Sequence, residues 1–239
     1  GCYTKGILPE VLEGMSIIDG QKWVLMQLTQ HATLVHTISI THAYPHCWRC
    51  HNKLMFRATD QWFCNLAHNG LVERALAAIE DITFVPDWGR ARLNAFVSNR
   101  TEWCISRQRQ WGVPIPALHC MICGIATQNA AIIRAVADRV ALEGIEYWDL
   151  ATPASLQVDG VLSANFSCVC GNKDLATFTL ERDILDVWFD SGVSHYAVLA
   201  RRKELSLPAA MYLEGSDQHR GWFQSALLCG MVLNNAAPM

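Results

Sequence analysis

The hydrophobic and polar positions of the chain follow a helical period in several places. Apolar residues spaced three and four apart predict amphipathic or apolar helices. These helices are expected from Gln21 onward, over 70–80 and 87–100, in an Ala-rich stretch that Gly144 closes, and over 222–233. Asp87 precedes the third of these segments and is expected to act as its N-cap.

Shorter apolar segments lie between these helices and favour strands. They are a segment after the first helix, LMFRATDQWF at 54–63, the start of DILDVWFDSG at 183–192, and MYLEG at 211–215. Pro114 and Pro116 impose an extended path after WCISRQRQWG. Because strands and helices alternate, the predicted fold class is α/β.

Residues 118–183 differ from the flanking segments in composition and in sequence pattern. They hold a Cys-x2-Cys pair, the Ala-rich helix, a loop and a Cys-x-Cys-Gly sequence. The strand and helix alternation resumes after them. We therefore interpret 118–183 as an inserted module.

Composition narrows the class of protein. The 239 residues are 51% hydrophobic and 17% charged, which is typical of a compact globular protein. The formal net charge of −3 gives no global sign of nucleic-acid binding, although a local basic stripe could still bind RNA. The sequence contains no apolar run of membrane-spanning length and no signal-peptide pattern, so we expect a cytoplasmic protein without a membrane partner.

Ten cysteines without a secretory signal indicate metal ligands or thiols rather than disulfides. Cys120 and Cys123 form one short-spaced pair, Cys168 and Cys170 form another, and a glycine follows each pair. Two such half-sites can supply the four thiolates of one tetrahedral structural zinc site. The alternative is that they are ordinary loop cysteines.

Cys47 and Cys50, in PHCWRCH, form a third pair. His42, His46 or His51 could add ligands, but contiguous ligands rarely close a tetrahedron by themselves. We interpret this pair as half of a zinc site.

The sequence YLEGSDQHRGWF at 212–223 is the strongest candidate for a binding loop, since it would follow a strand and precede a helix. Glu214 and Asp217 could accept hydrogen bonds from an amino group or ribose hydroxyls, and Gln218 could donate or accept. Gly215 would allow close backbone approach, and His219 lies where a phosphate is favoured. A polar loop that only caps a helix uses similar residues. Neither a Rossmann glycine motif nor a P-loop occurs in the sequence.

Four blocks of the sequence, in this order, resemble bacterial isoleucyl-tRNA synthetases, which are class I aminoacyl-tRNA synthetases. The blocks are YPHCWRC with FRATDQWF (44–63), WCISRQRQWGVPIP (103–116), DVWFDSG (186–192) and YLEGSDQHRGWFQSALL (212–228). Valyl and leucyl relatives share the architecture but differ within these blocks. In 118–183 the match is limited to the cysteine pattern.

The resemblance implies a reaction in which ATP, with Mg²⁺, activates L-isoleucine to isoleucyl-adenylate before transfer to tRNA(Ile), in a monomeric protein. Glu214, Gly215, Asp217 and Gln218, followed by His219, resemble the adenylate-binding loop. The tryptophans Trp188 and Trp222 resemble those that wall the isoleucine side-chain pocket. An apolar pocket of this kind can reject valine only about 10- to 200-fold, which fits the family's separate editing domain.

The sequence also departs from the family, because it contains neither the HIGH nor the KMSKS motif. We therefore assign no catalytic residue to this chain and expect an internal fragment that does not activate isoleucine alone. The resemblance divides it into the tail of the editing insertion (1–42), a catalytic segment with a zinc half-site (43–117), a zinc-bearing second insertion (118–183) and the truncated second half of a Rossmann-like catalytic domain (184–239).

Two other interpretations of the sequence stay open. One is a standalone zinc-stabilised RNA-binding module, and the other is a truncation without function. Scattered arginines could serve the RNA-binding module, although such residues usually form a solvated face; they are Arg100, Arg107, Arg109, Arg201 and Arg202. The tryptophans and the EGSDQH sequence favour the synthetase, because an RNA clamp would not need them.

Overall fold

A computed structural model describes residues 2–4, 6, 9–56, 58–127 and 129–239, and it divides the chain into two compact units, 1–59 and 60–239. Each unit is described by itself. None of the helices in the described ranges is long and apolar enough to cross a membrane.

The first unit consists of one helix and a long irregular segment. A short 3-10 turn, η1 (Glu10–Leu12), precedes α1 (Ile17–Gln30). The helix begins before Gln21 because Ser16 caps it, its Oγ accepting from the Asp19 N–H at 3.1 Å. The strand expected after this helix is wrong for the described residues, which continue without regular structure to the turn at Cys47–Cys50.

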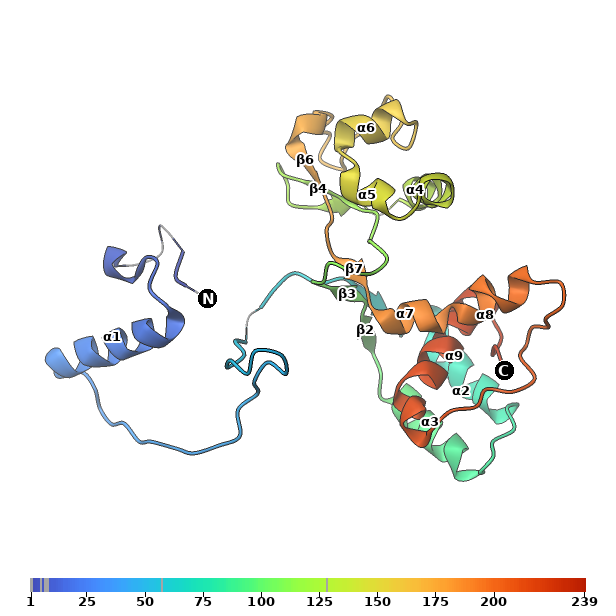
Figure 1. The fold of residues 1–239 in the computed structure, drawn as a ribbon, viewed down its shortest axis with the longest axis horizontal. Helices are drawn as coiled ribbons and strands as arrows, with labels where there is room; N and C mark the ends of the chain where they lie inside the picture. The colour runs from blue at the N-terminus through green and yellow to red at the C-terminus, as the bar shows by residue number, and fades with distance from the viewer. Residues whose placement is uncertain (1, 5, 7–8, 57, 128) are drawn as a thin grey trace. The chain divides into compact units, whose positions relative to one another are not determined.

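In the second unit, one group of elements surrounds the C-terminal helix (Figure 1). Strands β1 (Phe63–Asn65) and β2 (Glu102–Cys104) pair antiparallel. The helices are η2 (His68–Gly70), α2 (Leu71–Glu80), α3 (Trp88–Ser98), α7 (Val187–Gly192), α8 (Ser194–Ala197), η4 (Leu199–Arg201), η5 (Ser216–Arg220) and α9 (Trp222–Leu233). Buried apolar side chains of α2, α3 and α9 pack into one core with Trp103.

Residues 118–180 have a core of their own. Strands β4 (Leu118–Cys120), β5 (Ala126–Thr127) and β6 (Phe178–Leu180) form an antiparallel sheet in the order β5-β4-β6. The helices are α4 (Ala130–Glu143), α5 (Glu146–Leu150), α6 (Pro153–Val158) and η3 (Leu175–Thr177). Trp148 lies fully buried in this core.

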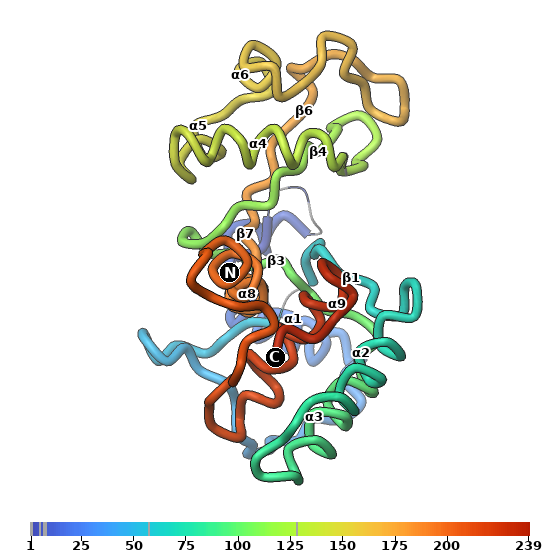
Figure 2. Tube along the Cα trace, turned by 90° about the vertical axis from the view of Figure 1, so that its right-hand side faces the viewer, coloured from blue at the N-terminus to red at the C-terminus, as the bar shows by residue number. Residues whose placement is uncertain are grey.

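Two short strands lie where the chain enters and leaves this module. They are β3 (Ser106–Arg107) and β7 (Ile184–Leu185), and they pair antiparallel. Figure 2 shows the module's helices and strands gathered on one side of this pair and α2, α3 and α9 on the other. Since the outgoing and returning strands bond to each other, the module can be inserted without separating the flanking segments.

The structure is mixed α/β, as predicted, and it confirms the helices at α2, α3, α4 and α9. Gly144 ends α4 with φ of 91°, a conformation that glycine adopts without strain. Asp87 lies at the N-cap position of α3, as predicted, but its backbone is already helical and its side chain makes no capping hydrogen bond.

Two predicted strands are wrong. Residues 211–215 form no strand, and in 54–63 only Phe63 belongs to one; Arg57 lies outside the described residues. A strand needs a neighbour to accept its backbone hydrogen bonds, and the named strands of the described part pair only antiparallel. The parallel sheet of a complete Rossmann-like domain is therefore not formed by the described residues.

Candidate functional site: a cavity beside Trp188 and a four-cysteine cluster

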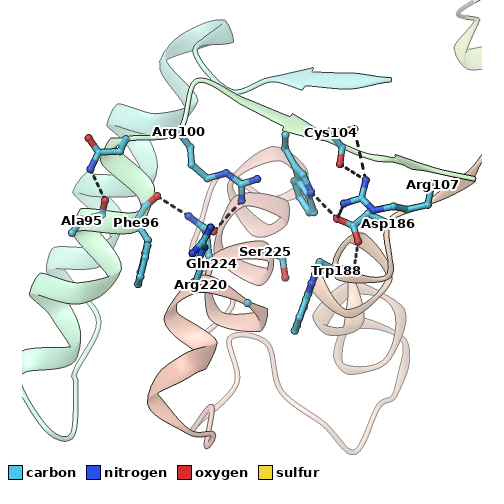
Figure 3. A pocket seen from close by; sticks show the side chains of 13 residues that line it. Ala95, Phe96, Arg100, Cys104, Arg107, Asp186, Trp188, Arg220, Gln224 and Ser225 are labelled. Atoms are coloured by element: carbon cyan, nitrogen blue, oxygen red, sulfur yellow. Dashed lines mark hydrogen bonds and ion pairs between the residues drawn. The ribbon is translucent and has the colours of Figure 1, made fainter. Parts of the chain in front are cut away.

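A cavity of about 710 Å³ opens between α3, β2 and the helices α7 and α9. Its walls mix aromatic, basic and amide side chains. Figure 3 shows Arg100 and Gln224 facing the space from one side, and Asp186 and Arg107 from the other. The wall therefore offers charged groups and an aromatic surface within one space.

Asp186 organises one side of this cavity from a buried position, with 4% of its surface exposed. One of its oxygens accepts hydrogen bonds from the Trp103 indole at 3.1 Å and the Arg107 guanidinium at 2.8 Å. The other accepts from the Trp188 N–H at 3.2 Å and so caps α7. Because one carboxylate makes all three bonds, the start of α7 is fixed to β2 and β3.

The Trp188 ring lies against Gly221 at the start of α9. A Cβ atom placed on Gly221 would be 3.0 Å from the Trp188 ring and 2.5 Å from Gln218 Oε1. Trp188 is 41% exposed and lines the cavity. A glycine is therefore required here for close approach of the aromatic ring to the backbone.

Trp222 is the first residue of α9, and the Tyr212 ring covers one face of its indole. The ring stacks on Tyr212 with centroids 4.2 Å apart and an interplanar angle of 8°. Its indole N–H donates to the Ser191 carbonyl at 3.0 Å. The structure thus places Trp188 and Trp222 on the packed pair α7 and α9, while only Trp188 lines the cavity.

The predicted adenylate loop divides into an exposed part and a structural part. Glu214, Gly215 and Asp217 are exposed and do not line the cavity. Gln218 Oε1 accepts from the Trp222 N–H at 2.9 Å and thereby caps α9. His219 is buried, with Nδ1 2.8 Å from the Ser216 carbonyl and its ring beside Trp88 of α3.

Several cavity residues were absent from the predicted substrate-binding set. Arg100 donates to Gln224 Oε1 at 2.9 Å, across 124 residues of sequence, and Gln224 donates to the Phe96 carbonyl at 2.8 Å. Burial lowers the pKa of Arg100, although the charge of Asp186 opposes this effect. Gln224 carried a usable signal, because it is a polar residue within an otherwise apolar helix.

The four cysteines of the inserted module converge. Their sulfur atoms all lie within 4.8 Å of one another. Cys120 and Cys170 sulfurs are 3.8 Å apart, and those of Cys123 and Cys168 are 3.5 Å apart, so each contact joins one pair to the other. This cluster could hold a metal ion.

The pKa values of Cys120 and Cys123 are shifted in opposite directions. Burial raises the pKa of Cys120, but hydrogen bonds from Asn172 and from backbone N–H groups of the Cys120–Cys123 turn outweigh it and lower the pKa to about 6. A backbone hydrogen bond from Ile125 lowers the pKa of Cys123, but burial and the neighbouring thiols outweigh this and raise it to about 12. Thiols crowded in this way cannot all ionise together without a cation.

Cys47 and Cys50 lie in the other unit. The Cys47 N–H donates to the Asn52 carbonyl and the His51 N–H to the Cys47 carbonyl, each at 2.8 Å, which closes a tight turn. Across the described ranges, the four-cysteine cluster is the one group of three or more metal-ligating side chains. The half-site assignment of Cys47 and Cys50 stays a prediction.

The mixed α/β fold and the sequence around the cavity define the class of protein. Residues 15–239 match the family described as tRNA synthetases class I (I, L, M and V), and the chain belongs to this family.

The similar proteins include several named isoleucine-tRNA ligase. Those of Geobacter sulfurreducens and Brachyspira hyodysenteriae are 45% identical over 238 residues and 42% identical over 240 residues, each match covering 100% of this chain and 25% of the relative. That of Syntrophotalea carbinolica is 46% identical over 230 residues, 96% of this chain and 24% of the relative. The chain spans about a quarter of the length of these relatives. The family resemblance predicted from the four blocks is confirmed.

Proposed function

We propose that this chain forms one wall of the amino-acid activation site of an isoleucine-tRNA ligase. The observation that carries the proposal is the position of Trp188, which Asp186 holds over Gly221 at the edge of the cavity. A flat, rigid indole surface suits a branched aliphatic side chain. The similar proteins are named isoleucine-tRNA ligase, which supports isoleucine as that amino acid.

In the proposed reaction, the carboxylate of L-isoleucine attacks the α-phosphorus of ATP and pyrophosphate leaves. The acyl group then passes to tRNA(Ile). Trp188 contacts the amino acid, and Trp222, whose ring stacks on Tyr212, supports this wall from the packed side of α9. The loop of Glu214, Gly215, Asp217 and Gln218 binds the adenylate, and His219 supports the loop from its buried position. The exposed carboxylates of Glu214 and Asp217 support this assignment, since they have no competing ion pair among the described residues. Contacts to the triphosphate and Mg²⁺ come from segments of the intact, cytoplasmic, monomeric enzyme outside these 239 residues.

We further propose that Cys120, Cys123, Cys168 and Cys170 bind a structural zinc ion. A tetrahedron of Zn–S bonds of about 2.3 Å has S–S edges of about 3.8 Å. The two contacts between the pairs, 3.8 and 3.5 Å, are close to this length. The metal would supply a cross-link between β4 and the loop that precedes β6. For Cys47 and Cys50, we propose half of a second zinc site, completed by ligands from outside the chain.

The test is isoleucine-dependent exchange of pyrophosphate into ATP by the intact enzyme. Trp188→Ala is expected to lower kcat/KM for isoleucine about 10- to 200-fold. Val187→Ala is the matched control, because Val187 is adjacent and 66% exposed. Equal kcat/KM values for both variants would contradict the assignment of Trp188. Robust exchange by the 239-residue chain alone would contradict the proposal that other segments complete the site.

A further inference from the structure

Asn172 contacts both cysteine pairs of the four-cysteine cluster. Its backbone carbonyl accepts a hydrogen bond from the Cys168 N–H at 2.8 Å. Its side-chain Nδ2 donates to the Cys120 sulfur at 3.4 Å. One residue therefore ties the loop of the second pair to a ligand atom of the first.

The orientation of the Asn172 amide is fixed by its other bonds. Its Oδ1 accepts from the Asp174 N–H at 3.1 Å, so the oxygen is already committed to a donor. Its Nδ2 also donates to Thr177 Oγ1 at 2.6 Å, and this hydroxyl in turn donates to the Asp174 carbonyl at 2.7 Å. The network leaves the NH₂ group, not the oxygen, facing the Cys120 sulfur.

An N–H donor is the favourable group at this position. Four thiolates around one Zn²⁺ carry a net charge of −2, and partly buried negative charge is stabilised by hydrogen-bond donors. Groups that bond to metal ligands in this way hold the ligand in place and raise metal affinity.

We propose that Asn172 is a positioning residue that joins the two cysteine pairs and preorganises them for the metal. This inference rests on the proposed zinc site and deepens it. The backbone bond to Cys168 survives any substitution of the side chain, so variants at position 172 test the link to Cys120 alone. The two pairs are then ordered before the metal binds, so less conformational entropy is lost on binding and the affinity for the metal increases.

The experiment measures zinc affinity of the intact, metal-stripped protein by competition with a chromogenic chelator. Asn172→Ala is expected to weaken zinc binding about 10- to 100-fold. Asn172→Asp keeps the shape but places carboxylate oxygens beside the thiolates, and we expect it to weaken binding more than Asn172→Ala. Thr177→Ala leaves the amide in place but removes one of its partners, so a smaller loss is expected.

Gln157→Ala is the matched control. Gln157 is an amide of the same module whose Nε2 donates to the Ser163 carbonyl at 3.2 Å. Substitution with cobalt gives a second readout, since charge-transfer absorption from thiolate to Co²⁺ reports how many sulfurs bind. In a Cys47→Ser, Cys50→Ser background, which removes the second proposed site, we expect four sulfurs with and without Asn172→Ala, because this substitution lowers affinity without removing a ligand.

The possible results distinguish the role of Asn172 from the proposed zinc site. A wild-type protein that takes up no zinc at this cluster contradicts the zinc site and the role of Asn172 together. Wild-type binding with equal affinities for Asn172→Ala and Gln157→Ala contradicts the role of Asn172 alone. Should Asn172→Ala fail to fold, Asn172→Asp, which keeps the shape of the side chain, is compared with Gln157→Ala instead, and equal affinities for these two variants contradict the role of Asn172.

Discussion

The Glu181 carboxylate accepts a hydrogen bond from the Trp62 indole at 2.7 Å, across 119 residues of sequence. The same oxygen lies 2.9 Å from Nε2 of His119 in β4, and the other oxygen accepts from the N–H groups of Arg182 and Asp183 at 2.7 and 2.9 Å. Glu181 therefore connects the cysteine-bearing module to the segment that precedes β1, at the point where the chain leaves the module.

Glu181→Gln is expected to lower the free energy of unfolding by about 2 kcal/mol. The amide loses the negative charge shared by four donors, and its NH₂ group must face one of those donors. Urea denaturation of the wild-type and variant proteins measures the difference. Glu204→Gln, at an exposed position, is the control, and equal midpoints for the two variants would contradict a structural role for Glu181.

The hydrogen bonds to Glu181 also predict that the protein loses stability in acid. Burial raises its pKa, but hydrogen bonds from Trp62, the Asp183 N–H, His119 and the Arg182 N–H outweigh burial and lower the pKa to about 2, from an ordinary value of 4.5. Because the folded-state pKa is depressed, the stabilisation is fully present above about pH 4.5 and disappears as the pH falls toward 2.

Unfolding free energies of wild-type protein and Glu181→Gln should therefore converge between pH 4.5 and 2. Protonation of the cysteine cluster affects both proteins equally and cancels in the difference. A difference that stays constant across this range would show that the Glu181 pKa is not lowered by folding.

Asp186→Ala is expected to destabilise the protein by about 2–4 kcal/mol. It removes the cap of α7 and leaves the buried Trp103 indole and the Arg107 guanidinium without their shared acceptor. Thermal unfolding of the intact enzyme compares it with Asp138→Ala, an exposed position on α4. A change no larger than that of the control would contradict the role of Asp186 in holding α7.

The sequence predicts elements whose formation depends on local pattern, and less well those that depend on distant partners. The helix α9 is predicted by a continuous apolar segment, and the two cysteine pairs are recognised by their spacing. The strand expected at 211–215 does not form, because strand formation depends on a neighbouring strand. The Arg100–Gln224 bond joins residues 124 positions apart, and no local pattern reveals such a contact.

The candidate site shows the same division. Trp188 and Trp222 follow from the blocks they occupy, but only the structure shows that Tyr212 covers the Trp222 ring while Trp188 faces the cavity. Likewise, the sequence predicts that His219 belongs to the binding loop, whereas its burial against α3 depends on packing between segments far apart in sequence.

Gly221→Ala tests the contact between α9 and Trp188 with a single methyl group. The added Cβ would lie 2.5 Å from Gln218 Oε1 and 3.0 Å from the Trp188 ring, so the ring, the capping amide or both must move. We expect a loss of about 1–3 kcal/mol in unfolding free energy.

In the intact enzyme, we expect Gly221→Ala to raise KM for isoleucine about 10-fold or more, because the displaced Trp188 ring no longer fits the isoleucine side chain. KM for ATP, measured in the same exchange assay, is the internal control and should change less. A folded Gly221→Ala enzyme with an unchanged KM for isoleucine would show that the position of the Trp188 ring does not set amino-acid binding.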